Sequence, residues 1–191
     1  MSPNEIKNLQ KRVGANPDGF WGPVSIAACR MHLRKLMPHI SPWPKPDYDS
    51  LRKFYGEPGD ESNLVTIEFP YRMLYEGKAV SRGRVHRKCA DSLRRVLEDI
   101  GGQFNDAPDI VDEASDYGGC FNNRNKRGGS SKSLHAWGAA IDLDADDNSF
   151  RDSWPVKSDM PIEIIEAFAR EGWMSAAAFW GYDAMHFQAT R

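Results

Sequence analysis

Apolar residues at helical spacing predict a small helical unit at the start of the chain. Ile6, Leu9 and Val13 recur every three to four residues, as expected for one face of a helix. A second helix is predicted to begin at Pro23, since proline is favoured at the first helical position. A third is predicted within YDSLRKFYG, residues 48–56. Their apolar stripes are expected to pack together as a three-helix bundle.

A proline-rich segment follows the second predicted helix. SPWPKP, residues 41–46, alternates three prolines with other residues, which removes backbone donors and favours an extended, semi-rigid connector. Beyond Asn63 the pattern mixes helices and strands. We therefore expect a helical unit with its connector over residues 1–46 and a second domain over residues 47–191, with the boundary as late as about residue 62.

The second domain is predicted to be α+β. LVTIEF at residues 64–69 is a β-branched run typical of a strand, and DIVDEAS at residues 109–115 is predicted as another strand. Apolar residues at helical spacing predict a helix over residues 84–101. A further helix is predicted over residues 159–172, with Asp159 as N-cap, Pro161 at the start and Gly172 at the end.

Small residues separate a histidine from an aspartate in SLHAWGAAID, residues 133–142. The alternation after Gly138 predicts a strand with Asp142 projecting from one face. His135 precedes the glycine, where a bend can fold its ring back over that face, and Ala139 and Ala140 leave the space clear.

A second alternating segment, WGYDAMHFQAT, lies near the end of the chain. It predicts a strand in which His186 could meet Asp142 across an antiparallel pair. With His135 this makes two nitrogens and one oxygen, a known ligand set for catalytic zinc with a fourth position open to water. Asp183 is placed to accept a proton from that water. Each histidine alone would more often be a structural residue, so the prediction depends on the three together.

Composition and charge narrow the function classes. The 191 residues are 40% hydrophobic and 27% charged, with a formal net charge of -2, which fits a globular chain with no global attraction for polyanions. RGRVHRK at residues 82–88 is a local basic cluster, expected to be a solvated helix start rather than a nucleic-acid patch, because no aromatic residues interleave with it. Cys29, Cys89 and Cys120 fit neither a disulfide framework nor a zinc ribbon and are expected to be packed small residues in a reducing compartment.

The first residues, MSPNEIKNLQKR, lack the apolar core of a secretory signal, and the sequence has no apolar run of about 18 residues. We therefore expect a protein made in the cytoplasm, without a signal peptide and without membrane insertion.

These two histidine motifs resemble those of the M15 family, the VanY-like zinc D-Ala-D-Ala carboxypeptidases and L-Ala-D-Glu peptidases, whose pattern is SxHxxGxAxD followed by DxxH or ExxH. SLHAWGAAID and DAMH match every fixed position. The resemblance covers about the last 130 residues. It implies one zinc ion held by His135, Asp142 and His186, with Asp183 as general base.

The family also has an arginine ahead of the first motif that stabilises the oxyanion. The segment GGCFNNRNKRGGSS is similar to the family there. The resemblance implies that Arg124 has this role, with Arg127 as a second candidate and a plain surface-loop residue as the alternative.

The first unit resembles the peptidoglycan-binding repeat of cell-wall hydrolases in IKNLQKRVGANPDGFWGPVSIAA. Asp18 and Trp21 match the family's turn and are candidate substrate-binding residues. The usual closing FQ is replaced by CRMHLRKLM. Trp21 is equally compatible with a place in the core.

An alternative metal site in DLDADDNSFRDS, residues 142–153, resembles an EF-hand loop but fails at two anchors. Its sixth position is Asp147 instead of glycine, and its twelfth is Ser153 instead of glutamate. Asp144, Asp146 and Asp147 are expected to be a solvated strand end.

These observations together predict a monomeric peptidoglycan hydrolase of the endolysin type, made in the host cytoplasm and acting on the wall after release. Zinc-activated water would cleave an amide of the stem peptide, most simply as an L-Ala-D-Glu endopeptidase. The alternatives are a D,D- or L,D-carboxypeptidase of the same fold and a non-catalytic wall-binding protein.

Overall fold

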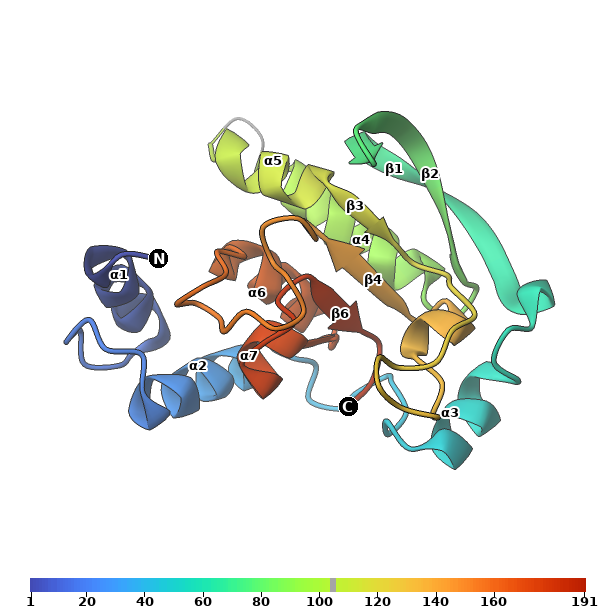
Figure 1. Ribbon diagram of the computed structural model, residues 1–191, viewed down its shortest axis with the longest axis horizontal. Coiled ribbons are helices and arrows are strands. Elements are labelled where there is room, and N and C mark those ends of the chain that lie inside the picture. The colour runs from blue at the N-terminus through green and yellow to red at the C-terminus, as the bar shows by residue number, and fades with distance from the viewer. Residues whose placement is uncertain (104–105) are drawn as a thin grey trace.

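The computed structural model describes residues 1–103 and 106–191 (Figure 1). The α-helices are α1 (Pro3–Val13), α2 (Pro23–Leu36), α3 (Tyr48–Tyr55), α4 (Ala90–Gly101), α5 (Pro108–Ser115), α6 (Ile162–Arg170) and α7 (Ala176–Trp180). The strands are β1 (Leu64–Tyr75), β2 (Lys78–His86), β3 (Tyr117–Gly119), β4 (Ala140–Leu143), β5 (Met174–Ser175) and β6 (His186–Gln188). Short 3-10 turns are η1 (Glu61–Asn63) and η2 (Leu134–Trp137). This mixture of helices and short antiparallel sheets is consistent with the predicted α+β peptidase domain.

The central sheet of the described residues has the antiparallel order β3-β4-β6-β5. Its two middle strands come from the two segments predicted to carry the chemistry, and Asp142 pairs directly with His186. The antiparallel pairing expected from the sequence is therefore confirmed.

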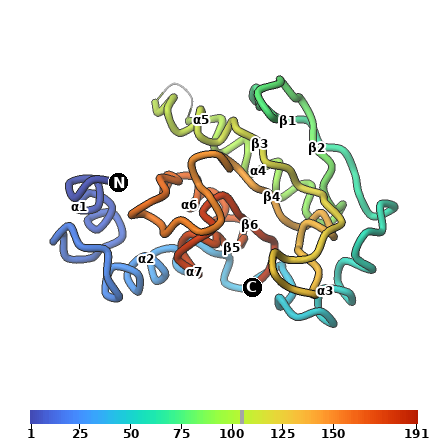
Figure 2. Tube along the Cα trace, viewed as in Figure 1, coloured from blue at the N-terminus to red at the C-terminus, as the bar shows by residue number. Residues whose placement is uncertain are grey.

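Helices pack behind this sheet and hold it rigid (Figures 1 and 2). Ile141 and Phe187 from the middle strands are fully buried, and the Phe187 ring stacks on Phe168 of α6 with ring centroids 4.0 Å apart. Leu93 of α4 is equally buried. Full burial of each such side chain contributes about 1.5–3 kcal/mol, so the strands that carry the site rest on a well-packed core.

The β1–β2 hairpin stands beside the central sheet (Figure 1). The predicted strand over residues 64–69 is present and extends to Tyr75. The helix predicted over residues 84–101 is wrong in its first turns, because Arg84 and His86 pair with β1 and α4 begins only at Ala90. Val85 fits the helical stripe by spacing, but it also fits strand alternation, and pairing with β1 decides the structure.

The basic cluster RGRVHRK therefore lies at the end of a strand and in the following turn, not at a helix start. Its central histidine, His86, is buried, and its ring nitrogen donates to the carbonyl oxygen of Tyr55 at 2.9 Å.

The strand predicted over residues 109–115 is also wrong. The segment forms α5, with Pro108 in the first turn. Val111 and Ala114 are buried three residues apart, which is helical rather than strand spacing. The β-branched pair in DIVDEAS suggested a strand, but the proline at the helix start and the helical burial outweigh that preference.

The helix predicted over residues 159–172 is confirmed but shorter. α6 runs from Ile162 to Arg170 with Pro161 in the N-cap position. Asp159 does not cap it, and instead accepts a hydrogen bond of 3.2 Å from the Asn148 side chain. Gly172 follows the helix with a positive φ of 76°.

The predicted helices α1, α2 and α3 are all present, but the three-helix bundle is not confirmed. α1 and α2 pack against each other and against α6, where Arg12 forms ion pairs with Glu163 and Glu166. α3 lies elsewhere, and the Tyr55 hydroxyl donates to the carbonyl oxygen of Ala189 at 2.6 Å. The first helices thus share a continuous core with the rest of the chain.

The proline-rich segment lies against this core rather than free in solvent. Trp43 is buried, its ring lies edge-on to Trp173, and its indole N–H donates to the carbonyl oxygen of Glu171 at 2.9 Å. Cys29, Cys89 and Cys120 are buried free thiols, as predicted. Within the described ranges no helix has the length and apolar character needed to span a bilayer.

Candidate metal centre

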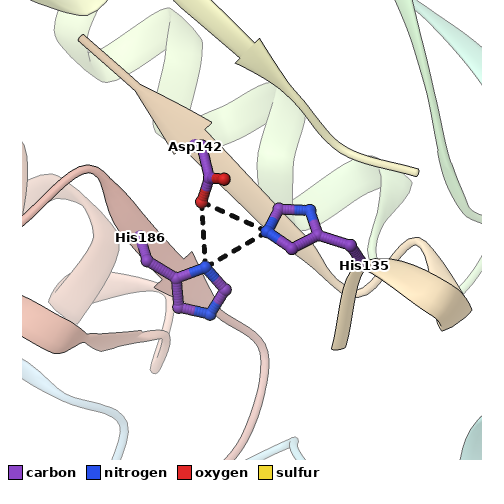
Figure 3. A group of neighbouring side chains, drawn as sticks. All are labelled: His135, Asp142 and His186. Carbon is purple, nitrogen blue, oxygen red and sulfur yellow. Dashed lines mark hydrogen bonds and ion pairs between the residues drawn. The ribbon is translucent and has the colours of Figure 1, made fainter. Parts of the chain in front are cut away.

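His135, Asp142 and His186 converge on one point (Figure 3). Asp142 Oδ1 lies 3.1 Å from His135 Nε2 and 2.9 Å from His186 Nδ1, and the two ring nitrogens are 3.2 Å apart. These separations approach the roughly 3.3 Å expected of donors that share one tetrahedral zinc ion. The structure thus brings together all three side chains that the sequence assigned to the metal.

Local structure explains how residues seven apart reach the same point. His135 lies in η2, where its backbone N–H faces the Ser133 hydroxyl, and Gly138 ends the turn with a φ of 66°. This left-handed conformation favours glycine and redirects the chain into β4, which carries Asp142. Ala139 and Ala140 are fully buried, so the turn fits closely under the sheet.

The outer nitrogen of each imidazole faces a fixed acceptor. His135 Nδ1 lies 3.0 Å from the carbonyl oxygen of Cys120, and His186 Nε2 lies 3.2 Å from Gln188 Oε1. Because an oxygen acceptor requires an N–H partner, the hydrogens sit on these outer nitrogens in the neutral rings. The two inner nitrogens then present lone pairs to each other and to the carboxylate.

Two facing lone pairs beside an anionic oxygen repel one another unless a cation lies between them. The donor set therefore fits a divalent metal ion, and the outer hydrogen bonds are the kind that orient histidine ligands. A proton on one inner nitrogen also relieves the repulsion. Burial alone would raise the pKa of Asp142, but the hydrogen bonds and positive charge that His135 and His186 supply when they are protonated outweigh it and hold the pKa well below its usual range.

Asp183 borders the same cavity from the loop before β6. It adopts a left-handed conformation with φ 58°, and its carbonyl oxygen accepts the His186 N–H at 3.0 Å. Burial raises the pKa of its carboxyl group, and the nearby Asp142 charge acts in the same direction against the attraction of His186. No donor among the described residues bonds its carboxylate, so this group is free to accept a proton.

A cavity of about 380 Å³ opens in front of the cluster. Its lining includes cationic residues of one loop, Arg124 and Arg127 among them, several aromatic residues, and Asp183 and His186. The Arg127 guanidinium lies 5.3 Å from the Phe150 ring centroid. Arg124 lines the same cavity as Asp142 and His186, and its role at the oxyanion stays a prediction.

Asp18 and Trp21 both make contacts within the protein. Asp18 Oδ1 accepts hydrogen bonds from the Gln10 side chain at 2.7 Å and from the Phe20 N–H at 2.8 Å, which fix the turn between α1 and α2. Trp21 packs edge-on against Trp154 with centroids 5.4 Å apart. Their substrate-binding role stays a prediction.

The acidic residues after β4 differ from the expected solvated strand end. Asp146 and Asp147 are exposed, but Asp144 is only 5% exposed and accepts a hydrogen bond of 2.6 Å from the Asn148 side chain. Burial and the neighbouring Glu113 carboxylate raise the pKa of Asp144 to about 8. The chain turns here, with Asp144 at a φ of 50° and its carbonyl oxygen accepting the Asn148 N–H at 3.2 Å, which strand alternation could not indicate.

Sequence reasoning missed two residues that hold His186. Gln188 orients the ring from two positions further along the same strand face, and period-two spacing could have identified it. Trp180 stacks on the ring with centroids 6.0 Å apart, and no sequence signal pointed to this residue.

The last third of the chain matches a known family model. Residues 127–189, 63 of the 191, match the M15 peptidase family model described as D-alanyl-D-alanine carboxypeptidase. The matched segment contains His135, Asp142, Asp183 and His186. No curated protein and no solved structure matches the chain. Over this third of the chain the protein is similar to the M15 peptidases, which supports a peptidase in general.

Proposed function

We propose that the chain is a zinc endopeptidase that cleaves an amide bond in the peptidoglycan stem peptide, with the L-Ala-D-Glu bond as the first candidate. The convergence of His135, Asp142 and His186 carries this proposal, because their lone pairs and charge form a cation site beside an unpaired carboxylate. A purely structural metal site would have no use for Asp183.

A bound zinc ion supplies Lewis-acid chemistry, polarising a carbonyl group and lowering the pKa of a water molecule. Asp183, whose pKa is raised, accepts a proton from the attacking water and delivers it to the departing amine. Arg124 lies at the edge of the cluster and stabilises the negative charge that develops on the carbonyl oxygen. Trp180 and Gln188 hold the His186 ring in place.

Open space on both sides of the cluster favours an endopeptidase over a carboxypeptidase. The cavity of about 380 Å³ lies on one side, and a second of about 370 Å³ reaches the cluster from the β1–β2 hairpin. Arg124 and Asp142 border both. A peptide can therefore extend past the reacting bond in both directions, whereas removal of a terminal residue requires no second cavity.

For the first unit we propose wall binding and deployment as an endolysin, on the strength of the predicted peptidoglycan-binding repeat. Phe20, at the turn between α1 and α2, is 71% exposed and is available to a wall polymer. Phe20→Ser is expected to lower binding to isolated sacculi and to leave cleavage of a soluble stem peptide unchanged. Equal losses on both substrates would contradict a binding role for this turn.

Mass spectrometry of digested peptidoglycan tests the main proposal. Internal cleavage is expected to give new amino and carboxyl termini within the stem, and none with Asp183→Asn. Release of a single terminal D-Ala would instead support the carboxypeptidase. An unchanged wall with metal-loaded protein would support the non-catalytic alternative.

A further inference from the structure

The second cavity, of about 370 Å³ beside the β1–β2 hairpin, is lined partly by residues that have no role in the proposed metal chemistry. β2 contributes Gly83 and the alternate residues Val80, Arg82 and Arg84, and alternate side chains of a strand point the same way. Val80, Arg82 and Arg84 line this cavity, whereas Val85 points away and is buried in the core. The basic cluster of the sequence thus places two arginines, Arg82 and Arg84, in the lining of a space that also reaches His135 and Asp142.

The cavity carries an excess of positive charge. Arg82, Arg84 and Arg124 line it, and the single acidic residue of its lining is Asp142, which is engaged by the two imidazoles. Among the described residues no carboxylate lies within ion-pair distance of Arg82. This guanidinium is therefore available to a ligand.

Arg84 is engaged only weakly. Its Nη2 lies 2.7 Å from Glu61 Oε2, but both side chains are about half exposed, and such pairs contribute little. The guanidinium also lies 5.6 Å from the Phe121 ring centroid, which orients it beside the cavity. A carboxylate entering the cavity can replace Glu61 at small cost.

We propose that Arg82, with Arg84, binds a carboxylate group of the substrate next to the scissile bond, so that the enzyme selects acidic peptides. The inference rests on the proposed function. A guanidinium offers paired N–H donors that match a carboxylate, and the cavity joins this site directly to the metal cluster. Tyr75 and Phe121 supply apolar surface for the peptide chain beside it.

The test uses two synthetic stem peptides that differ only in a carboxylate or a carboxamide on the residue flanking the scissile bond. Each is hydrolysed by the wild type, Arg82→Gln, Arg82→Lys and Arg72→Gln. Arg72 is an exposed β1 residue that does not line the cavity, so its variant controls for lost charge on the hairpin. Thermal melting of each variant checks that the hairpin is intact.

Arg82→Gln is expected to raise KM for the carboxylate peptide by roughly tenfold, the effect of one charge-assisted hydrogen bond, with little change in kcat. Its KM for the carboxamide peptide should stay at the wild-type value, and Arg82→Lys should fall between. Arg72→Gln should behave as the wild type on both peptides. Equal losses on the two peptides, or no loss, would overturn the inference.

Calorimetric titration separates this result from failure of the proposed function. The same peptides are titrated into full-length Asp183→Asn protein with and without Arg82→Gln. Tighter binding of the carboxylate peptide, lost with Arg82→Gln, supports the arginine site even if the wild type cleaves neither peptide, which would refute only the proposed function. Equal affinity for the two peptides, or no binding, would refute the arginine site.

Discussion

Replacing Gly138 by alanine tests whether the turn between His135 and Asp142 holds the site together. Gly138 has a φ of 66°, and an added Cβ would lie 2.6 Å from Leu64 Cδ2 and 3.0 Å from the backbone nitrogen of His86. The leucine methyl group can move. The His86 nitrogen cannot move easily, because it donates to the Gly138 carbonyl oxygen at 2.8 Å.

Gly14 provides a matched control. It also adopts a left-handed conformation, with φ 78°, but an added Cβ would meet nothing within 4 Å. Both substitutions carry the left-handed cost of roughly 1–2 kcal/mol, reduced by about 0.4–1 kcal/mol because alanine restricts the unfolded chain. Only Gly138→Ala adds overpacking, about 1–3 kcal/mol. We expect losses near 1 kcal/mol for Gly14→Ala and about 2–4 kcal/mol for Gly138→Ala.

Urea denaturation followed by circular dichroism gives both free energies of unfolding. Chelator competition then measures zinc affinity, which should fall for Gly138→Ala, because the turn sets the distance between two ligands, and remain unchanged for Gly14→Ala. Equal unfolding free energies for the two variants, or unchanged zinc affinity in Gly138→Ala, would refute the proposed role of this turn.

Three further predictions follow from the site and its surroundings. Asp183→Asn should lower kcat by about 10²–10⁴ while zinc content by elemental analysis stays at wild-type level, and full activity would remove the assigned base. Gln188→Ala should weaken zinc binding by about 10–100-fold in chelator competition, whereas unchanged affinity would show that the His186 ring needs no such partner. Burial acts to raise the pKa of Glu166, but hydrogen bonds, chiefly from Arg12, outweigh it and lower the pKa below its usual value of 4.5. The resulting stabilisation is present above about pH 4.5 and is lost as the pH falls through the lowered pKa. Arg12→Ala should therefore lower the free energy of unfolding by about 1 kcal/mol near pH 7 and by less in acid. The same loss at pH 3 and pH 7 would contradict this prediction.

The metal cluster could be predicted from the sequence because its geometry follows from local rules. Strand alternation placed Asp142 and His186 on facing positions, and one glycine explained how His135 returns to the same point. Both predictions need only the two-residue repeat of a strand and the geometry of one turn. Asp183 was assigned from its position three residues before His186, whereas Arg124 was assigned only through the resemblance to the M15 family; both line the same cavity.

The parts that could not be predicted depend on tertiary contacts. The segment over residues 84–86 has side chains that suit a helix or a strand, and only the partner β1 decides between them. The sequence predicts a solvated Asp144, but its side chain is buried and accepts a hydrogen bond from Asn148 in the following loop. Trp180 contacts His186 through the packing of α7, which has no periodic signal of its own.

A crystal structure of zinc-soaked protein, with anomalous data collected at the zinc absorption edge, tests the central claim most directly. A single strong peak is expected within bonding distance of His135 Nε2, Asp142 Oδ1 and His186 Nδ1, and His186→Ala should abolish it. A peak bound elsewhere, or two imidazoles that point into separate regions without a shared ion, would contradict the metal centre and the hydrolase derived from it.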